Sequence, residues 1–246
     1  MTARGRAIVT GATSGIGEAT VRALVSSGRQ VLAIARREDR LRALAKATGA
    51  ETLAADVRDL GKHAAHLTGF EPDILINNAG VGHGISGLDG MSPDQLQEAF
   101  DINVVAPLKL IACLTPGMKA RGRGHVVNIG SIAGLHTLLS AVYGGTKSAI
   151  HRISQNLRVE LSGTGIRVTE IAPGRVASEF YQAAEGDRER LAAMGVSGIR
   201  ELQPEDIANA ILFAVDAPAH VNVATLEILP TEQAVGGIKA EAVRDQ

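Results

Sequence analysis

Short, mostly apolar runs alternate with longer amphipathic stretches along the whole chain. Each run is only a few residues long and is bounded by polar residues or glycine, which is typical of buried strands. The runs cover residues 6–10, 30–35, 51–55, 73–77, 125–129, 166–171 and 224–229. The stretches between them carry apolar residues at helical spacing. The pattern therefore predicts seven strands separated by helices.

Apolar strands that alternate with helices indicate a parallel sheet whose two faces are both covered. Because the crossovers between parallel strands are right-handed, such a sheet is doubly wound. No linker, internal repeat, charge block or low-complexity stretch divides the 246 residues. We therefore expect an α/β protein with one seven-stranded parallel sheet and a single domain over residues 1–246.

A glycine-rich turn, Thr10–Gly17, joins the first strand to the first helix. Glycine reaches backbone angles that other residues avoid, so a phosphate can approach the main chain closely. The free N–H groups and the positive dipole end of the following helix attract that phosphate. The spacing G-x-x-x-G-x-G differs from the commoner dinucleotide pattern, and a tight turn without a ligand is the alternative. The binding interpretation assigns cofactor contacts to Gly11, Thr13, Ser14, Gly15, Ile16 and Gly17.

Two further strand ends bear on the choice of cofactor. The second strand has no acidic residue from 30 to 37 to hold a ribose 2′-hydroxyl, and it is followed by Arg36 and Arg37. Guanidinium groups suit a 2′-phosphate, so we predict NADP(H), the alternative being two solvent-facing arginines. After the third strand, Asp56 and Val57 are assigned as cofactor contacts. Asp56 could accept a hydrogen bond from the adenine amino group, and capping of the next helix is the alternative.

The fourth strand ends in Asn77-Asn78-Ala79-Gly80. The pattern T-G-x-x-x-G-I-G, followed at this distance by N-N-A-G, resembles the short-chain dehydrogenase/reductase family over residues 4–230. The resemblance implies a Rossmann sheet with strand order 3-2-1-4-5-6-7 and a nicotinamide cofactor. The small residues Asn78, Ala79 and Gly80 would let this cofactor lie across the sheet.

By the same resemblance, Asn103, Ser131, Tyr143 and Lys147 form the catalytic group, and Tyr143 and Lys147 also contact the cofactor. Tyr143 and Lys147 are four residues apart and share one helix face. A free phenol has a pKa near ~10, too high for efficient proton exchange at neutral pH. A neighbouring ammonium and an oxidised nicotinamide would favour the phenolate. Lys147 can also hold the ribose hydroxyls, and Ser131 can hydrogen-bond the substrate oxygen.

Pro107 lies inside the helix that opens with the capping sequence Ser92-Pro93-Asp94-Gln95. Because proline has no N–H, the carbonyl of Asn103 loses its helical partner. We expect this carbonyl to hold a water molecule near Lys147. An ordinary proline kink is the alternative.

The second half of the chain carries the remaining expected contacts. Pro173, Gly174, Val176 and Ser178 resemble the family motif Pro-Gly-x-Val-x-Thr, in which the hydroxyl would bond the nicotinamide amide. The segment at about 178–202 matches the family's substrate lid. Eleven residues separate Ser131 from Tyr143, where many relatives have twelve, so we expect the loop 132–142 to give the substrate pocket a different shape.

The tail at 217–230 and the sequence Tyr-Gly-Gly-Thr-Lys resemble bacterial NADP-dependent 3-hydroxy acid and serine dehydrogenases, including the malonic semialdehyde reductase type. This implies hydride transfer between NADP(H) and a small polar carbonyl or alcohol, such as a 3-hydroxy acid or semialdehyde. Reductases of larger ketones or aldehydes, including sulfoacetaldehyde- and clavulanate-type relatives, and a catalytically silent NADP-binding sensor are the alternatives. An acidic substrate would need a cation, and the candidates are Arg175, Arg188, Arg190 and Arg200; solvated surface charges are the other interpretation.

Composition bears on partners and location. A net charge of −1, and the absence of tryptophan, argue against nucleic-acid and acidic-membrane binding. The single cysteine, Cys113, excludes an internal disulfide, and the isolated His83, His136 and His151 have no metal-ligand spacing. The chain goes straight into a strand and has no apolar run of about 18 residues. We expect a cytoplasmic enzyme without a metal that acts on a small molecule and forms a homo-oligomer, a dimer or tetramer.

Overall fold

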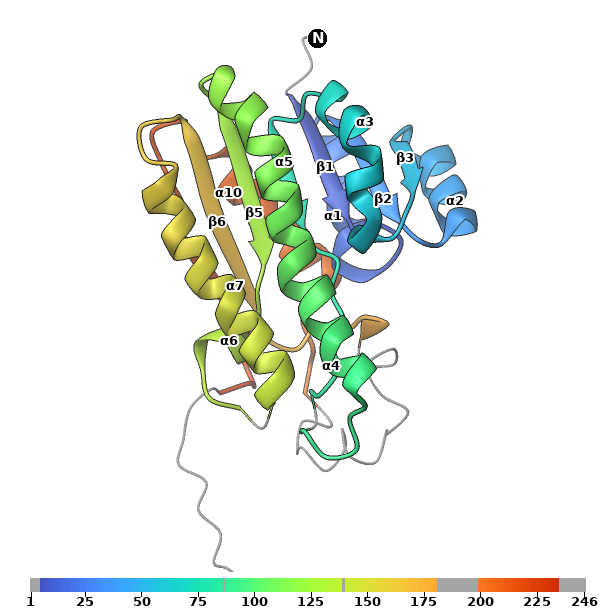
Figure 1. Cartoon of the computed structure of the whole chain (residues 1–246), viewed down its shortest axis with the longest axis vertical. Helices are drawn as coiled ribbons and strands as arrows, with labels where there is room; N and C mark the ends of the chain where they lie inside the picture. The colour runs from blue at the N-terminus through green and yellow to red at the C-terminus, as the bar shows by residue number, and fades with distance from the viewer. Residues whose placement is uncertain (1–4, 86, 139, 181–198, 235–246) are drawn as a thin grey trace, which may run out of the picture.

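A seven-stranded parallel sheet lies at the centre of the computed structural model, which describes residues 5–85, 87–138, 140–180 and 199–234 (Figure 1). The strands are β1 (Arg6–Thr10), β2 (Gln30–Ala35), β3 (Glu51–Ala54), β4 (Ile74–Asn77), β5 (Gly124–Ile129), β6 (Ile166–Pro173) and β7 (Thr225–Ile228). Their order is β3-β2-β1-β4-β5-β6-β7, and every neighbouring pair is parallel. The predicted doubly wound fold and strand order are confirmed.

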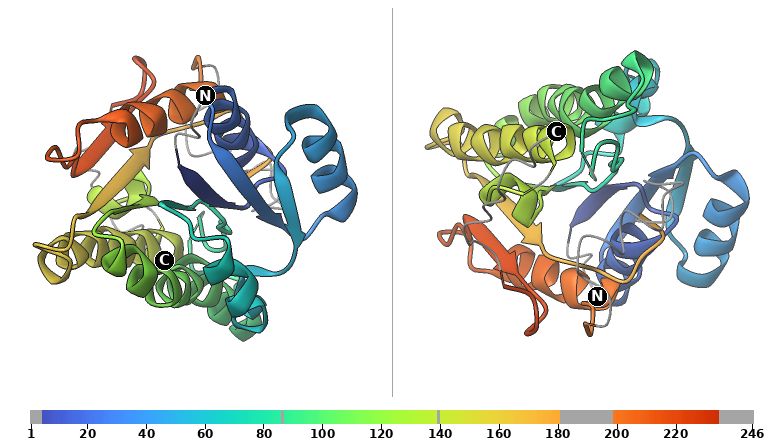
Figure 2. Two further views of the ribbon diagram at one scale, coloured as in Figure 1. Left: turned by 90° about the horizontal axis from the view of Figure 1, so that it is seen from above. Right: turned by 90° about the horizontal axis from the view of Figure 1, so that it is seen from below.

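Helices cover both faces of this sheet (Figure 2). The helices on one face are α1 (Gly15–Ser26), α2 (Glu38–Thr48) and α10 (Pro204–Asp216). The other face is covered by η1 (Val57–His63), α3 (Ala64–Gly69), α4 (Pro93–Phe100), η2 (Asp101–Val105), α5 (Ala106–Ala120) and α7 (Ala141–Glu160), and the short helix α6 (Ile132–Leu135) precedes α7.

The core has two halves because successive strand residues point to opposite faces of a sheet. In β1, Ala7 and Val9 pack with the α1 and α10 side, whereas Ile8 packs with the α5 and α7 side. Neighbouring β2 alternates in the same way. Because both faces of the sheet are buried, the strands are nearly continuous apolar runs in the sequence.

The helix before the candidate site begins with the expected capping box. Ser92 Oγ accepts a hydrogen bond from the Gln95 main-chain N–H at 3.2 Å, and Gln95 Oε1 accepts one from the Ser92 N–H at 2.9 Å. The presence of Pro107 predicted an interruption of this helix, and one is observed. It is a π-helical turn, η2, in which the Ala106 N–H donates to the Asp101 carbonyl. Such single π turns are frequent at functional sites.

In the described part of the chain, one helical stretch, Pro93–Ala120, is long and apolar enough to cross a membrane by length and composition alone, with a mean hydropathy of 1.4. Half of its apolar window is buried inside the molecule. Leu110, Leu114 and Met118 of this stretch belong to the core against the sheet. That placement is the one expected of a core helix.

Candidate active site

Two groups of residues predicted to bind the cofactor follow the carboxyl ends of β1 and β4, where the strand order reverses direction. Parallel α/β sheets bind ligands at this position. In the turn after β1, Gly11 and Gly15 adopt left-handed φ angles of 66° and 49°. A Cβ at Gly17 would lie only 2.2 Å from the Gly11 carbonyl oxygen. The turn therefore requires glycine at these positions, and it presents the amino end of α1 to the sheet edge.

Asn78 and Thr10 tie this turn to the end of β4. Asn78 Nδ2 donates to the Thr10 carbonyl at 2.9 Å and to the Gly11 carbonyl at 3.3 Å. Thr10 Oγ1 accepts hydrogen bonds from the main-chain N–H groups of Asn78 and Ala79. The side chain of Asn78 thus holds the glycine turn in place, and its predicted cofactor contact stays a prediction.

Arg37 lies beside the glycine turn, whereas Arg36 faces outward. Arg37 NH2 donates to Ser14 Oγ at 2.7 Å, and its Nε donates to Thr13 Oγ1 at 3.2 Å. Arg36 is 3.8 Å from Asp56 Oδ2 and its side chain is 63% exposed. The structure therefore brings Arg37 to the predicted phosphate-binding turn, whereas Arg36 pairs with Asp56 instead.

Arg40, one turn further along α2, joins the same cluster. Its NH1 donates to both carboxylate oxygens of Glu179, at 2.7 and 2.9 Å, and Arg37 NH1 donates to the same carboxylate at 2.9 Å. These two guanidinium groups hold the pKa of Glu179 below its usual value, the bond to Arg37 being the larger cause. Arg40 is not among the residues predicted from the sequence, and its i, i+3 spacing from Arg37 is the signal that could have found it.

Asp56 caps the helix that follows β3. Its Oδ1 accepts from the Arg58 main-chain N–H at 2.9 Å, and its Oδ2 accepts from Arg58 NH2 at 2.7 Å. The hydrogen bond from the Arg58 side chain is the main reason that the pKa of Asp56 is lowered. Of the two interpretations of Asp56, capping is observed, and the adenine contact of Asp56 and Val57 stays a prediction.

Lys147 and Tyr143 lie on the same face of α7, as predicted. The Lys147 ammonium is 5.7 Å from the centre of the Tyr143 ring and donates to the Ile129 carbonyl at 2.8 Å. Both side chains are buried. Burial lowers the pKa of Lys147 to about 8, and the opposing charge of Glu170 limits this shift. At neutral pH the ammonium is therefore still charged beside the phenol.

Asn103 connects the loop after β4 to α7. Its Oδ1 accepts from the Val81 N–H at 2.8 Å, and its Nδ2 donates to the Val81 carbonyl at 2.9 Å and to Thr146 Oγ1 at 3.1 Å. A Cβ at Gly80 would lie 3.2 Å from Asn103 Oδ1 and 3.8 Å from Lys147 Nζ. The side-chain amide of Asn103 thus holds Val81 and Thr146 in place. The water predicted at the main-chain carbonyl of Asn103 stays a prediction.

Ser131 stands at the end of β5 and begins α6. Its Oγ accepts from the Ala133 N–H at 3.1 Å, and the residue is buried. Two residues before Ser131, the Ile129 carbonyl accepts the hydrogen bond from Lys147. The structure brings Ser131, Lys147, Tyr143 and Asn103 to the carboxyl ends of β4 and β5.

The motif after β6 ends beside the glycine turn. β6 ends at Pro173, and a Cβ at Gly174 would be 2.5 Å from Gln233 Oε1. Val176 forms a parallel bridge with Leu202. The Cβ of Ser178 lies 3.0 Å from the position that a Cβ of Gly15 would occupy. Ser178 therefore lies against the glycine turn.

The candidate acid-binding arginines are only partly described. The Arg175 guanidinium pairs with the Glu201 carboxylate. Arg200 is exposed, and its main-chain N–H donates to Glu232 at 2.9 Å. Arg188 and Arg190, with most of the predicted lid, lie outside the described residues.

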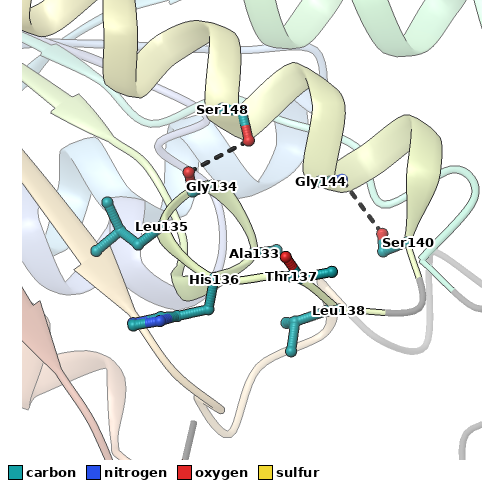
Figure 3. Close-up of a pocket in the computed structure, with 9 residues that line it drawn as sticks. All are labelled: Ala133, Gly134, Leu135, His136, Thr137, Leu138, Ser140, Gly144 and Ser148. Atoms are coloured by element: carbon teal, nitrogen blue, oxygen red, sulfur yellow. Dashed lines mark hydrogen bonds between the residues drawn. The ribbon is translucent and has the colours of Figure 1, made fainter. Parts of the chain in front are cut away.

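A pocket of about 250 Å³ opens beside α6 and the start of α7 (Figure 3). It is lined by Ala133, Gly134, Leu135, His136, Thr137, Leu138, Ser140, Gly144 and Ser148. Ser140 Oγ accepts from the Gly144 N–H, and Ser148 Oγ donates to the Gly134 carbonyl. Ser131 and Tyr143 do not line it. The loop 132–142 therefore forms a pocket that adjoins the predicted catalytic group without including it.

The three histidines that are isolated in the sequence each meet a carboxylate in space. The pairs are His83 with Glu98 at 2.9 Å, His136 with Glu227 at 2.6 Å and His151 with Glu170 at 2.6 Å. Among the described residues, no group of three or more His, Cys, Asp or Glu side chains is arranged to hold a metal ion.

Comparison with known proteins identifies a family for this arrangement. The family model for short chain dehydrogenases matches residues 6–189. The NADP-dependent 3-hydroxy acid dehydrogenase YdfG of Salmonella typhi is 36% identical over 94% of this chain and 97% of its own length. The Escherichia coli K12 protein of the same name is 35% identical, with the same coverage of both chains.

Solved structures agree with this result. The closed form of a serine dehydrogenase complexed with NADP+ is 34% identical, covers 97% of this chain and all of its own, and has a TM-score of 0.89. A metagenomic short-chain oxidoreductase in complex with NADP is 29% identical, covers 94% of this chain and 99% of its own, and has a TM-score of 0.77.

Proposed function

Because this chain belongs to the short-chain dehydrogenase/reductase family and is an NADP-dependent oxidoreductase, we propose that its substrates are small polar carbonyls or alcohols, such as a 3-hydroxy acid or semialdehyde. The observation that carries the chemistry is the charged Lys147 ammonium at 5.7 Å from the Tyr143 ring, in a buried site. The substrate class is supported by relatives named for 3-hydroxy acids and for serine, which is itself a 3-hydroxy acid.

The described residues fit NADP(H). The glycine turn leaves no room for a side chain at Gly17, so a pyrophosphate can approach the main chain at the amino end of α1. Arg37 and Arg40 already bind an oxyanion, the Glu179 carboxylate, which is the chemistry required for a 2′-phosphate. When bound, the cofactor would supply or accept the hydride at its nicotinamide.

In this proposal Tyr143 transfers the proton to or from the substrate oxygen. The Lys147 charge favours the phenolate and so assists that transfer. Ser131 donates a hydrogen bond to the same oxygen, where negative charge develops during reduction. Asn103 positions Val81 and Thr146 around the site through its side-chain amide.

Replacement of Tyr143 by Phe tests the proton donor. The ring packing survives and only the hydroxyl is lost, so we expect turnover to fall by ~10²–10⁴ while NADPH binding is retained. Turnover is measured as NADPH consumption and binding as cofactor fluorescence. A variant that kept more than about a tenth of the wild-type rate would show that Tyr143 is not the general acid.

A panel of carbonyl compounds tests the substrate class. We expect a higher kcat/KM for short semialdehydes and 3-oxo acids than for neutral aldehydes of similar size. A preference for bulky ketones would instead favour a reductase of larger substrates. Tight NADPH binding without turnover of any compound would favour the NADP-binding sensor.

The four candidate arginines, Arg175, Arg188, Arg190 and Arg200, are tested one at a time as Ala variants. Binding energy from a remote carboxylate orients the carbonyl, so the true clamp variant should raise KM for an anionic substrate and hardly change it for a neutral one. If no variant distinguishes the two substrates, an acidic substrate is excluded and a neutral carbonyl becomes the better assignment.

We also propose that the protein works in the cytoplasm as a dimer or tetramer. Two large apolar side chains on the described surface support the oligomer: Val159 of α7 is 77% exposed and Phe213 of α10 is 64% exposed. Light scattering at several protein concentrations should give a mass above that of one 25.6 kDa chain. Val159→Asp or Phe213→Asp should lower this mass, whereas a single-chain mass for the wild type would refute the proposal.

A further inference from the structure

Three consecutive residues after β6 contact three different parts of the candidate site. Ser178 packs over Gly15 of the glycine turn. Glu179 binds Arg37 and Arg40 beside the end of β2. The Phe180 ring lies 5.6 Å from the Tyr143 ring, at an angle of 51°. We call residues 178–180 the strap.

The Glu179 carboxylate is held as a phosphate would be. Both of its oxygens accept guanidinium N–H groups at 2.7–2.9 Å, one oxygen from Arg40 alone and the other from Arg37 and Arg40. Arginine pairs bind carboxylates and phosphates with the same planar donor geometry. The Arg37–Arg40 pair is therefore a formed oxyanion site, and a residue of this chain occupies it.

Each of the three guanidinium nitrogens of Arg37 is engaged in this arrangement. Its Nε bonds Thr13, its NH2 bonds Ser14 and the Thr13 carbonyl, and its NH1 bonds Glu179. A 2′-phosphate cannot gain a bidentate contact with Arg37 unless one of these acceptors leaves. Glu179 is the acceptor on the exposed side, since its side chain is 46% exposed.

We propose that Glu179 competes with the 2′-phosphate of NADP(H) for Arg37 and Arg40, and that its displacement moves Phe180 away from Tyr143. This inference rests on the proposed role of Arg37 in binding the 2′-phosphate. A cofactor without that phosphate cannot displace Glu179 by charge. Glu179 is therefore a specificity-determining residue, and the strap links recognition of the adenosine end to access at the predicted proton donor.

Glu179→Gln tests the competition. Because the three charged groups are about half exposed, removing the carboxylate charge should tighten NADPH binding by about three- to tenfold and change NADH binding less than about twofold. Dissociation constants are measured by calorimetry on the intact protein. The NADPH effect should shrink as the salt concentration rises.

Glu71→Gln is the matched control. Glu71 is also an exposed carboxylate paired with an arginine, Arg6, at 3.2 Å, but that pair lies at the amino end of β1. This variant should leave both dissociation constants unchanged. Equal tightening in both Glu variants would show a general charge effect and overturn the competition.

Arg37→Ala and Arg40→Ala separate the inference from the function on which it rests. If neither variant changes the preference for NADPH over NADH, the proposed 2′-phosphate site is wrong. If they abolish the preference but Glu179→Gln leaves NADPH binding unchanged or weaker, the site stands and the competition by Glu179 is refuted.

Phe180→Trp tests the link to Tyr143. The chain contains no tryptophan, so the introduced indole is the only one and reports on its contact with Tyr143. The probes are 2′-AMP and 5′-AMP, which differ in the position of the phosphate and carry no nicotinamide to reach Tyr143 directly. We expect 2′-AMP to change the indole emission and 5′-AMP to leave it unchanged.

Arg40→Ala in the same background should remove the emission change by 2′-AMP. Displacement of bound NADPH shows separately that each probe occupies the site. If 2′-AMP displaces NADPH but leaves the emission constant, the strap does not link the two ends of the site, and that part of the proposal is overturned.

Discussion

Lys147 shows how the surroundings of a single residue set its chemistry. Burial lowers its pKa to about 8, and the negative charge of Glu170 opposes that shift. Glu170 is itself fully buried on β6 and accepts a hydrogen bond from His151 at 2.6 Å. The charge on Lys147 is present below its pKa and is lost as the pH rises through that value. Glu170 therefore extends the pH range in which Lys147 can assist Tyr143.

Glu170→Gln should lower the pKa of Lys147 below about 8, because it removes the charge that stabilises the ammonium. The alkaline limb of the kcat profile for carbonyl reduction should then move to lower pH, with NADPH binding unchanged at pH 6. His151→Gln is the control, since it removes the His151 contact and keeps the Glu170 charge. An equal shift in both variants would assign the effect to that contact instead.

At the scale of elements, the stretch α4–η2–α5 places Asn103. The capping box at Ser92 starts this stretch, and the π turn brings the Asn103 amide to Val81 and Thr146. Pro107 is the second residue after the turn and has no N–H for the carbonyl four residues before it. The same proline therefore interrupts the helix and leaves the Asn103 carbonyl without its α-helical donor.

Pro107→Ala provides that donor. If the Asn103 carbonyl holds a water near Lys147, kcat should fall by about tenfold, since small displacements of reacting groups have effects of this size or larger. The dissociation constant of NADPH should stay within about twofold of the wild-type value. Pro93→Ala is the control, because Pro93 is the first residue of α4, where no N–H is needed. An unchanged kcat in Pro107→Ala would remove the carbonyl from the mechanism.

At the scale of the whole molecule, the buried residues between β5 and β6 bear on acid stability. His125 of β5 is buried, and its Nε2 lies 2.8 Å from Thr169 Oγ1 of β6. Burial, with a smaller effect of Arg167, lowers the pKa of His125 to about 3. The unfolded chain therefore binds a proton at His125 between pH 6.5 and 3, where the folded chain does not. Folding is destabilised as the pH falls through this window.

His125→Gln should reduce the loss of folding stability that occurs as the pH falls. Between pH 7 and pH 5, His125 accounts for a decrease of roughly 2 kcal/mol in the free energy of unfolding. The variant should start from a lower stability at pH 7, through altered packing, and then lose less on acidification. Urea unfolding at both pH values measures the difference. His220→Gln, at an exposed position, should retain the full wild-type pH dependence.

The sequence by itself determined the seven strands, their order and the family. Strand and helix periods, the capping box at Ser92 and the turn Thr10–Gly17 are local signals that a few neighbouring residues carry. They were confirmed with small differences: β6 extends to Pro173, and the interruption before Pro107 is a π turn. The NADP cofactor predicted from Arg36 and Arg37 is confirmed by the named relatives. The catalytic and cofactor-binding roles of individual residues remain predictions.

Only the tertiary structure decided which distant side chains meet. Glu179 is 142 residues from Arg37, and Glu170 is 19 residues from His151. No local pattern marks either pair, because a carboxylate and its partner on different elements leave no periodic signal in the chain. Their contact depends on how β2, α7 and β6 come together at the sheet. Burial has the same origin, since the low pKa of Lys147 arises from the packing that surrounds α7 and not from its spacing to Tyr143.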